Sequence, residues 1–382
     1  MKLKKIGIIC EYNPFHNGHI YHLEKIKESF PDSIIILVMS GNFTERGEIS
    51  CLNKWDKTTI ALKYGVDLVL ELPLFYATNS ADIFAEGAIR MLSYMDCDYL
   101  VFGSETNNIE LLTNLVDTQL YNEDYNILVK DYLDSGYNYP TSMSKALEDL
   151  TGETITSPND LLGLSYIKQI KLQEAKIIPL SIQRTNDYHG RTLDNRITSA
   201  TSIREALNNN LDISNYIPEE TLDCIKKFDE EKIFNILKYK IISEIETLDE
   251  YLDVTEGLDK RIKSYILKSN TLEELINNVK TKRYTYNRLK RMFLHILTNI
   301  KKDDIDKLQQ INYIRVLGFS KKGKTHLKEI RNQSLIPVIT NYSQLEDKIL
   351  DHELQMTFLY NLLTDQEELN IKELKSVPIN IE

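Results

Sequence analysis

Three histidines stand three residues apart near the start of the chain, in the stretch GIICEYNPFHNGHIYHLEKI, residues 7–26. They are His16, His19 and His22, and a proline and a glycine lie among them. Imidazole side chains could bind a metal ion, relay a proton or donate hydrogen bonds to a phosphate group. They could also be the polar residues of an ordinary turn, and His22 could lie on the exposed face of a helix. The residue types alone leave these alternatives open.

The segments on either side of the histidines predict where they lie. Residues 5–12 form an apolar run of strand length. Asn13 precedes a proline, which disfavours helix, so the strand ends there. Gly18 begins an amphipathic run and leaves room for a base or ribose against the backbone. We therefore expect the histidines at a strand-to-helix turn, where free N–H groups attract phosphate and an imidazole can stabilise developing charge.

The first half of the chain alternates strand and helix patterns. Further apolar runs span residues 33–39, 66–73, 98–104 and 175–184, and amphipathic segments lie between them. Strands that are apolar on both faces, alternating with helices, predict a doubly wound α/β fold with a parallel sheet. Ligands of such a sheet bind beyond the carboxyl ends of its strands.

Near residues 210–222 the pattern becomes mainly helical, so we predict two domains, 1–215 and 216–382. The composition places the chain among ordinary globular proteins. Its net charge of −11 argues against indiscriminate coating of nucleic acid, although a local basic patch remains compatible with it. The four cysteines form no CxxC pair, which fits a reducing cytoplasm. No run is long and apolar enough for a membrane helix, and the start is a poor signal peptide, so we predict a cytoplasmic location without a membrane partner.

Polar segments also follow the other predicted strands. The stretch SGNFTERGE begins at Ser40 and follows the second predicted strand. Gly103 ends the strand of VFGSE, and Arg184 ends the strand predicted over residues 175–184. Each could be a plain loop or cap, but a strand-end arginine is also a suitable anion clamp. Lys54, Asp56 and Lys57 open a helix and are expected mostly on its solvated face, with Lys57 the one candidate ligand among them.

A second candidate phosphate site is the stretch ITSATSIREAL, residues 197–207. Its hydroxyls, at Ser199, Thr201 and Ser202, could simply cap a helix. Together with the helix N-terminus and Arg204, they could also bind an anion, and we prefer that interpretation.

These motifs resemble a known family. HNGH, residues 16–19, resembles the HxGH signature of the nucleotidyltransferase superfamily, which is shared with class I aminoacyl-tRNA synthetases. The longer string EYNPFHNGHIYHL resembles the bacterial tRNA(Met) cytidine acetate ligases, in which Val-Gln is more typical at positions 44 and 45. In chain order the same resemblance extends to MSGNFTERGE, KWDKTTIALKYGVDLVLELP, VFGSE, SPNDLLGLSYIK, ITSATSIREAL and, more weakly, RVLGFSKKG.

The resemblance implies a nucleotidyltransferase-like, Rossmann-like domain over 1–215 that binds ATP, and a mainly helical tRNA-binding domain over 216–382. It implies that ATP activates acetate as acetyl-adenylate, and that the acetyl group then passes to N4 of the wobble cytidine of elongator tRNA(Met). Mg²⁺ would accompany ATP, and we predict no dedicated metal site. His16 and His19 are the implied catalytic residues. The implied ATP-binding residues are Ile9, Cys10, Glu11, Tyr12, Asn13, Pro14, Phe15, His16, Asn17, Gly18, His19, His22, Gly103, Asn159, Arg184, Ser199, Thr201 and Arg204.

A basic stretch in the C-terminal half has eight lysines and arginines between residues 280 and 302 and no acid. Tyrosines and a phenylalanine are interleaved with them, as in surfaces that contact RNA, although a solvated helix face is the simpler alternative. The predicted tRNA-binding residues are Lys282, Arg283, Arg288, Lys290 and Arg291. Two other functions stay open: a small-molecule adenylyltransferase or carboxylate–amine ligase, and a non-catalytic RNA-binding protein. The sequence does not predict the acyl pocket, the mode of tRNA selection or the group that orients the cytidine amine. It does not predict the oligomeric state either.

Overall fold

A computed structural model describes residues 3–184, 197–375 and 377–381. In this part of the chain an eight-stranded sheet has the order β5-β4-β1-β2-β3-β6-β7, and β8 also pairs with β6. The strands are β1 (Lys4–Cys10), β2 (Ser33–Ser40), β3 (Leu68–Leu72), β4 (Tyr99–Ser104), β5 (Ile178–Gln183), β6 (Ile314–Ser320), β7 (Val338–Ile339) and β8 (Ile379–Ile381). The first five are parallel, as predicted from their continuous apolar runs.

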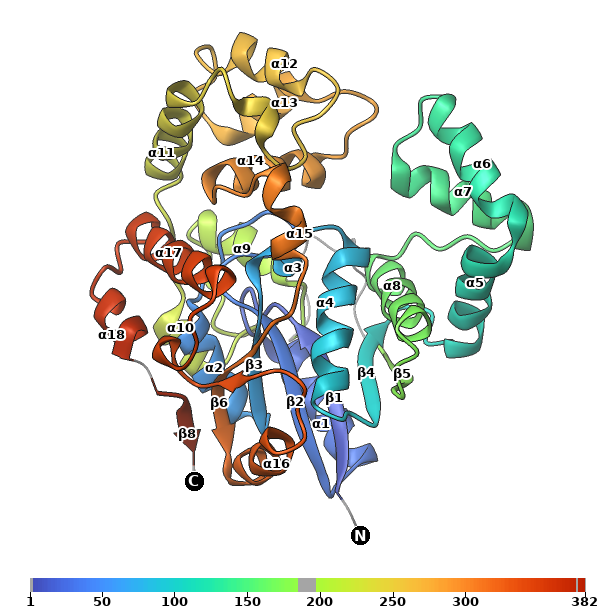
Figure 1. The fold of residues 1–382 in the computed structure, drawn as a ribbon, viewed down its shortest axis with the longest axis vertical. Coiled ribbons are helices and arrows are strands. Elements are labelled where there is room, and N and C mark those ends of the chain that lie inside the picture. The colour runs from blue at the N-terminus through green and yellow to red at the C-terminus, as the bar shows by residue number, and fades with distance from the viewer. Residues whose placement is uncertain (1–2, 185–196, 376, 382) are drawn as a thin grey trace.

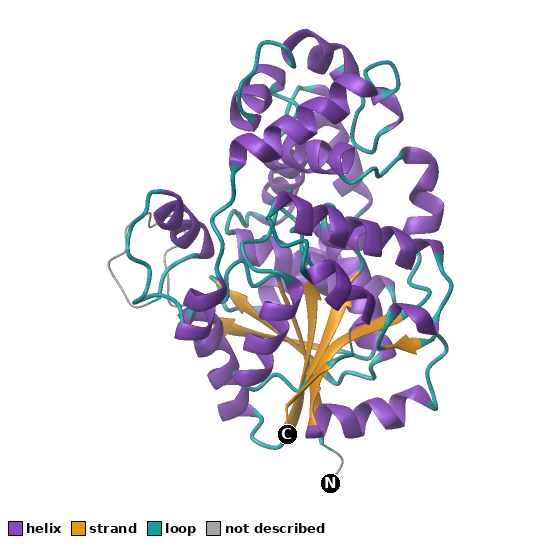
Figure 2. Ribbon diagram, turned by 90° about the vertical axis from the view of Figure 1, so that its left-hand side faces the viewer, coloured by secondary structure: helices purple, strands orange, loops and turns teal. Residues whose placement is uncertain are grey.

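Helices cover both faces of this sheet and extend beyond its carboxyl edge (Figures 1 and 2). The helices of the first half are α1 (Asn17–Ser29), α2 (Lys54–Lys63), α3 (Leu74–Ala77), α4 (Ala81–Tyr94), α5 (Ile109–Tyr121), α6 (Glu123–Asp134), α7 (Tyr139–Thr151), α8 (Pro158–Leu172) and α9 (Ala200–Asn208). Those of the second half are α10 (Glu219–Cys224), α11 (Glu230–Ser243), α12 (Leu258–Tyr265), α13 (Leu272–Val279), α14 (Tyr286–Leu297), α15 (Ile305–Leu308), α16 (Lys321–Arg331), α17 (Lys348–Leu363) and α18 (Leu369–Lys375).

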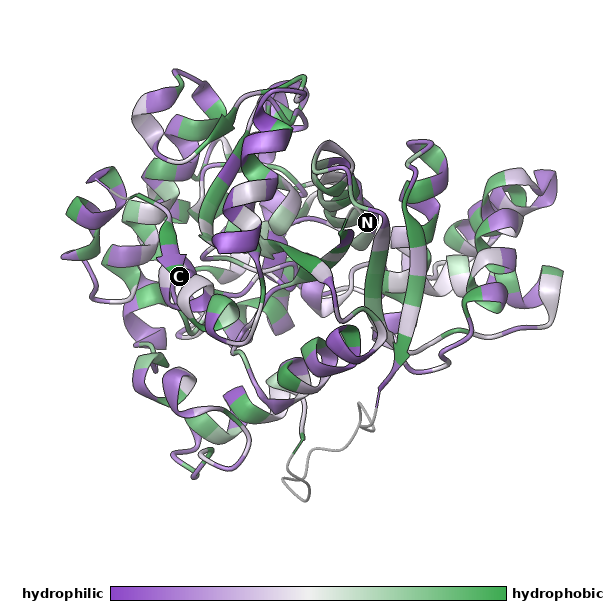
Figure 3. Ribbon diagram, turned by 90° about the horizontal axis from the view of Figure 1, so that it is seen from below, coloured by the Kyte–Doolittle hydropathy of each residue, from purple (hydrophilic) through white to green (hydrophobic). Residues whose placement is uncertain are grey.

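Alternation along the strands divides the core into two layers. On β2, Ile36 and Val38 pack on the layer that contains α4 and α8, whereas Leu37 and Met39 pack on the layer that contains α1 and α2. The helices carry mixed green and purple bands in Figure 3, as expected for elements with one buried face. The five parallel strands are thus packed against helices on both faces, and they end at a common carboxyl edge.

The C-terminal half differs from the predicted division at residue 215. Residues 234–296 of α11 to α14 share an apolar core of their own. After them, however, the chain returns to the sheet, where β6 pairs antiparallel with β3 and places Gly318 opposite Val69. The stretch 216–382 is thus not a separate helical unit throughout, because its last part completes the sheet of the first half.

A buried ionic cluster fastens the returning segment. Lys54 lies 2.9 Å from Glu71 and 2.7 Å from Glu373, and Arg315 of β6 lies 2.8 and 2.9 Å from the same carboxylates. Because each charge meets partners of opposite sign, the cluster can remain ionised away from water.

The expected solvated position of the α2 lysines is therefore wrong. Lys54 and Lys57 are both fully buried, and Lys57 donates to the backbone carbonyls of Glu11, Ser40 and Gly41. Lys57 thus joins the ends of β1 and β2 and is not available as a ligand. In the described part of the chain, no helix is long and apolar enough to cross a membrane.

Candidate functional site

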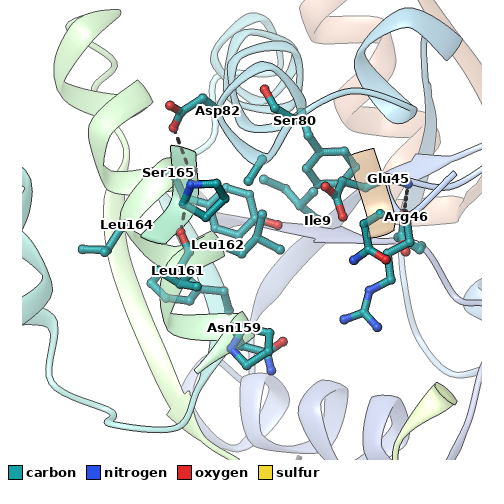
Figure 4. Close-up of a pocket in the computed structure, with 18 of the residues that line it drawn as sticks. Ile9, Glu45, Arg46, Ser80, Asp82, Asn159, Leu161, Leu162, Leu164 and Ser165 are labelled. Carbon is teal, nitrogen blue, oxygen red and sulfur yellow. Dashed lines mark hydrogen bonds between the residues drawn. The ribbon is translucent and has the colours of Figure 1, made fainter. Parts of the chain in front are cut away.

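A cavity of about 1080 Å³ opens at the carboxyl edge of the sheet (Figure 4). Its floor is formed by the segment that follows β1 and by the start of α1, and α9 closes one side. The starts of α4 and α8 and the inner face of α7 form an apolar wall. Residues of α14 and the turn before it also line the cavity, which therefore lies between the sheet edge, α7 and α14.

The histidine motif forms the N-terminus of α1, and its own side chains cap that helix. His16 is the N-cap of α1, and its Nδ1 accepts a hydrogen bond from the backbone N–H of Gly18 at 3.0 Å. His19 Nδ1 accepts in turn from the backbone N–H of His16 at 3.2 Å. This reciprocal arrangement corresponds to a capping box, in which histidines replace the usual hydroxyl and carboxylate residues.

The same hydrogen bonds fix the tautomer of both rings. An Nδ1 that accepts carries no proton, so in each neutral ring the proton lies on Nε2, which becomes a donor. Burial, followed by the nearby Arg184 and Arg204, lowers the pKa of His16 to about 3. Burial is also the main cause that lowers the pKa of His19. Both rings are thus neutral Nε2–H donors, suited to phosphoryl oxygens.

Gly18 contributes to the helix cap. A Cβ there would lie 2.7 Å from Cε1 of the His16 ring. The glycine therefore makes room for the cap, and because it also lines the cavity, its expected contact with a base or ribose stays a prediction.

Two arginines bring positive charge to the cavity. Arg184 follows β5, and its Nε lies 3.4 Å from Glu105, which also accepts a hydrogen bond from Asn159 at 2.5 Å. Arg204 of α9 donates to the carbonyl of Asn13 at 2.6 Å and lies 2.9 Å from Glu48. The predicted anion clamps thus meet at one cavity from strands and helices far apart in the sequence.

Helix α9 combines capping with exposure to the cavity. Ser199 is its N-cap and accepts from the N–H of Ser202. Ser199, Thr201 and Arg204 also line the cavity, and Thr201 accepts a hydrogen bond from Arg46 at 3.3 Å. The capping and anion-binding interpretations are therefore compatible in the same segment.

The basic stretch is largely engaged within the chain. Arg291 lies 2.8 Å from Glu45, and Lys290 lies 2.8 Å from Glu48, so α14 is docked on the turn that follows β2. Gly47 lies between these two contacts, and a Cβ there would be 2.5 Å from the backbone nitrogen of Arg291.

The three other predicted tRNA-binding residues line the cavity or lie on the surface. Arg288 faces Asp253 at 3.8 Å, and Arg283 faces Glu256 at 3.4 Å. Lys282 is exposed. Arg283, Arg288 and Arg291 line the cavity, whereas Lys282 and Lys290 do not.

Most of the predicted ATP-binding residues come together at this cavity. Those that line it are Ile9, Cys10, Glu11, Tyr12, Asn13, His16, Gly18, His19, His22, Gly103, Asn159, Arg184, Ser199, Thr201 and Arg204. Pro14, Phe15 and Asn17 do not: Phe15 is buried against Tyr12 and His19, and Asn17 bonds to backbone carbonyls of residues 215 and 216. The role of each residue toward ATP stays a prediction.

The alternatives for the third histidine are narrowed by its surroundings. His22 lines the cavity, and its Nε2 is buried without a hydrogen-bond partner among the described residues, which is not the environment of a solvated helix face. Burial lowers its pKa to about 4. No cluster of three or more His, Cys, Asp or Glu side chains suited to a metal ion occurs in the described ranges.

Sequence reasoning missed two parts of the site. Asp160 is fully buried and accepts from Ser104 and from the N–H groups of Glu105 and Thr106, so it shapes the turn after β4. The α7 wall, which includes Tyr139 and Leu147, also escaped notice. An acid in the first turn of a predicted helix was a signal for Asp160, but nothing local marks the α7 wall as part of a site.

Comparison with known proteins places this geometry in a family. Residues 3–375 match the family model described as HIGH Nucleotidyl Transferase. Curated relatives include a tRNA(Met) cytidine acetate ligase of Geobacillus sp. (strain WCH70), 39% identical over 377 residues that cover 94% of both chains. Another, from Fusobacterium nucleatum subsp. nucleatum, is 37% identical over 399 residues and covers 98% of this chain and 97% of its own.

Solved structures of Thermotoga maritima TmcAL have the same fold. The apo form matches with a TM-score of 0.90 at 28% identity, covering 99% of this chain and 100% of that one. A form bound with alpha-thio ATP matches with a TM-score of 0.89 at the same identity and coverage. The chain therefore belongs to the tRNA(Met) cytidine acetate ligase family of HIGH nucleotidyl transferases.

Proposed function

We propose that this chain is an ATP-dependent ligase that acetylates N4 of the wobble cytidine of elongator tRNA(Met). The observation that carries the proposal is one cavity that is lined by two neutral histidine donors and two arginines at the sheet edge, and also by residues of α7 and α14. The names of the relatives, tRNA(Met) cytidine acetate ligases, support the choice of acid and acceptor.

The first half-reaction joins acetate to the α-phosphorus of ATP. A carboxylate oxygen attacks, the bond to the β-phosphate oxygen breaks, and pyrophosphate leaves. Acetate is ionised at neutral pH, so this step needs no general base. His16, His19, Arg184 and Arg204 would orient the phosphates and stabilise the added charge. Mg²⁺, when bound, would neutralise phosphate oxygens and would be held by ATP and water.

The second half-reaction requires an RNA base inside the cavity. The cytidine N4 attacks the acetyl carbonyl carbon and AMP leaves. An anticodon loop can splay one base at low cost, and aromatic side chains can stack on the bases beside it. Tyr139 of α7 is 51% exposed and lines the same cavity as Arg288 and Arg291 of α14, which supports a loop bound between the two helices.

The tRNA-binding residues fall into two classes under this proposal. Lys282, Arg283 and Arg288 would contact RNA phosphates directly. Lys290 and Arg291 are engaged with Glu48 and Glu45, so they would act mainly by holding α14 in position.

Pyrophosphate–ATP exchange without tRNA tests the proposal. We expect exchange that requires acetate, because adenylation precedes the use of tRNA. His19→Ala should abolish it, whereas His352→Ala, which removes an imidazole bonded to the carbonyl of Thr298 outside the cavity, should not. If exchange is independent of acetate and requires a small phosphorylated acceptor, the result would instead support a small-molecule adenylyltransferase. ATP binding without exchange, with or without tRNA, would overturn the proposal in favour of a non-catalytic protein.

A further inference from the structure

The two half-reactions differ in their need for a base. Adenylation of ionised acetate releases no proton, but acetyl transfer converts an N4 amino group with two hydrogens into an amide with one. The N4 lone pair is conjugated with the ring, so removal of a proton as the C–N bond forms would assist attack. The following inference rests on the proposed function and concerns the residue that accepts this proton.

Glu11 lines the cavity beside the histidine motif. It follows β1 directly, between that strand and the histidine motif, and lines the cavity. One oxygen, Oε1, accepts a hydrogen bond from the backbone N–H of Glu45 at 2.6 Å. The carboxylate is therefore fixed at the carboxyl edge that also holds His16 and His19.

The other acids that line the cavity are occupied by cations. Among the described residues these are Glu45, Asp82 and Asp253. Glu45 pairs with Arg291 at 2.8 Å. Asp82 pairs with Lys168 at 3.0 Å and also accepts from Ser165. Asp253 faces Arg288 and His295. Glu11 forms no ion pair within the described part of the chain, so it alone of the four remains free to accept a proton.

The cavity histidines are poor alternatives. His16 and His19 use Nδ1 as an acceptor within the turn, and Nε2 already carries the proton of each neutral ring. The lowered pKa of His22 makes its unpaired Nε2 a weak base.

We propose that Glu11 is the general base of the transfer step. As the N4–C bond forms, one N4 proton passes to the Glu11 carboxylate. The tetrahedral carbon then expels AMP by breaking its bond to the phosphate oxygen, and the carboxyl group returns the proton to water.

The electrostatic surroundings suit this role. Burial raises the pKa of Glu11 to about 7, and the carboxylates of Glu45 and Glu48 act in the same direction. The Glu45 N–H and Arg46 lower it, and the Lys57 ammonium contacts the Glu11 carbonyl from α2. A base with a pKa close to the working pH is efficient in proton transfer.

Glu11→Gln separates catalysis from structure, because the amide oxygen can still accept from the Glu45 N–H. Acetate-dependent pyrophosphate exchange and single-turnover acetyl transfer to tRNA are measured on the same preparations. We expect transfer to fall by about 100-fold or more, as is usual for loss of a general base. Because Glu11 is also a predicted ATP-binding residue, exchange should fall as well, but by less than about tenfold. Asp117→Asn, which removes a surface carboxylate paired with Lys171, is the control for charge and should change neither rate appreciably.

The pH profile of transfer gives a second readout. The wild-type rate should rise with pH through a midpoint near the pKa of Glu11, and Glu11→Gln should lose that rise. Glu45→Gln removes a carboxylate that raises this pKa, so it should move the midpoint to lower pH.

Several outcomes would overturn the inference. Transfer by Glu11→Gln within about threefold of wild type would do so, as would an equal loss of exchange and transfer. If Glu11→Gln does not fold, Glu11→Asp retains the carboxylate and should keep the pH-dependent rise, and its absence there would refute the role. Absence of acetate-dependent exchange in the wild type would be a failure of the proposed function and is recognised before any variant is compared.

Discussion

Gly47 tests whether the docking of α14 on the β2–α2 turn matters for the chemistry. Its φ of 72° lies in the left-handed region, and a Cβ would lie 2.5 Å from the nitrogen of Arg291 and 2.6 Å from the carbonyl carbon of Lys290. Gly47→Ala therefore has two costs, which are backbone strain and a clash with the backbone of Lys290 and Arg291 on α14. Gly152 has nearly the same φ, 75°, but nothing lies within 4 Å of its Cβ position. Gly152→Ala is thus a control that has the strain alone.

The magnitudes follow from these two geometries. Left-handed backbone costs an L residue about 1–2 kcal/mol, which both variants share. Relief of the clash needs a shift of about 1 Å, and overpacking of this kind costs about 1–3 kcal/mol more. That shift would move Glu45 and Arg46, and a displacement of about 1 Å at a site can lower activity by about 10²-fold. Urea unfolding should show Gly47→Ala as the less stable variant.

The functional assay is acetate-dependent pyrophosphate exchange followed by acetyl transfer to tRNA. We expect Gly47→Ala to lose about tenfold or more in transfer, and Gly152→Ala to stay within about twofold of wild type. Equal stability and equal transfer rates for the two variants would refute the reasoning, because the contact between the turn and α14 would then carry no consequence.

Three other changes test separate features. Lys57→Met leaves buried carbonyls without a donor and should lower the free energy of unfolding by about 3 kcal/mol in urea melts; Lys63→Met on the same helix, at a side chain 52% exposed, should cost under about 1 kcal/mol. Burial and the neighbouring Glu71 raise the pKa of Glu353, so at intermediate pH the folded protein holds a proton that unfolding releases. The free energy of unfolding therefore falls as the pH rises from the ordinary carboxyl range toward the raised pKa of the folded state. Relative to Glu353→Gln, wild-type stability should thus fall by up to about 1.4 kcal/mol per pH unit between about pH 5 and 7, and parallel curves would contradict the raised pKa. Lys282→Glu should weaken tRNA binding, more so at low salt, and spare exchange, whereas Lys290→Glu should impair both because it also breaks the contact with Glu48; equal effects on exchange would count against the two classes of basic residue.

The sequence was sufficient where local chemistry decides the structure. Continuous apolar runs predicted the five parallel strands, and the order strand, proline, glycine predicted that His16 would lie at a helix start. The second phosphate motif was predicted in the same way, since Ser199 is both a cap and a cavity residue.

The parts that were missed depend on partners distant in the sequence. Strand β6 was not predicted because Arg315 interrupts its apolar pattern, and the burial of that arginine depends on its contacts with Glu71, Glu373 and Tyr342. Lys54 looked like a surface residue for the same reason. The contacts of Lys290 and Arg291 with Glu48 and Glu45 join segments more than 200 residues apart, and no local pattern encodes such pairs.

The antiparallel pairing of β6 with β3 has a consequence for how the protein is made. A nascent chain that has left the ribosome as far as residue 72 already contains the first three strands, but β3 then has one unpaired edge rich in leucine and valine. At roughly 5–20 residues per second, the covering strand emerges some tens of seconds later. During that interval the edge is a template for pairing with other chains. The demand for chaperones should therefore be concentrated on ribosomes that translate the middle of this message.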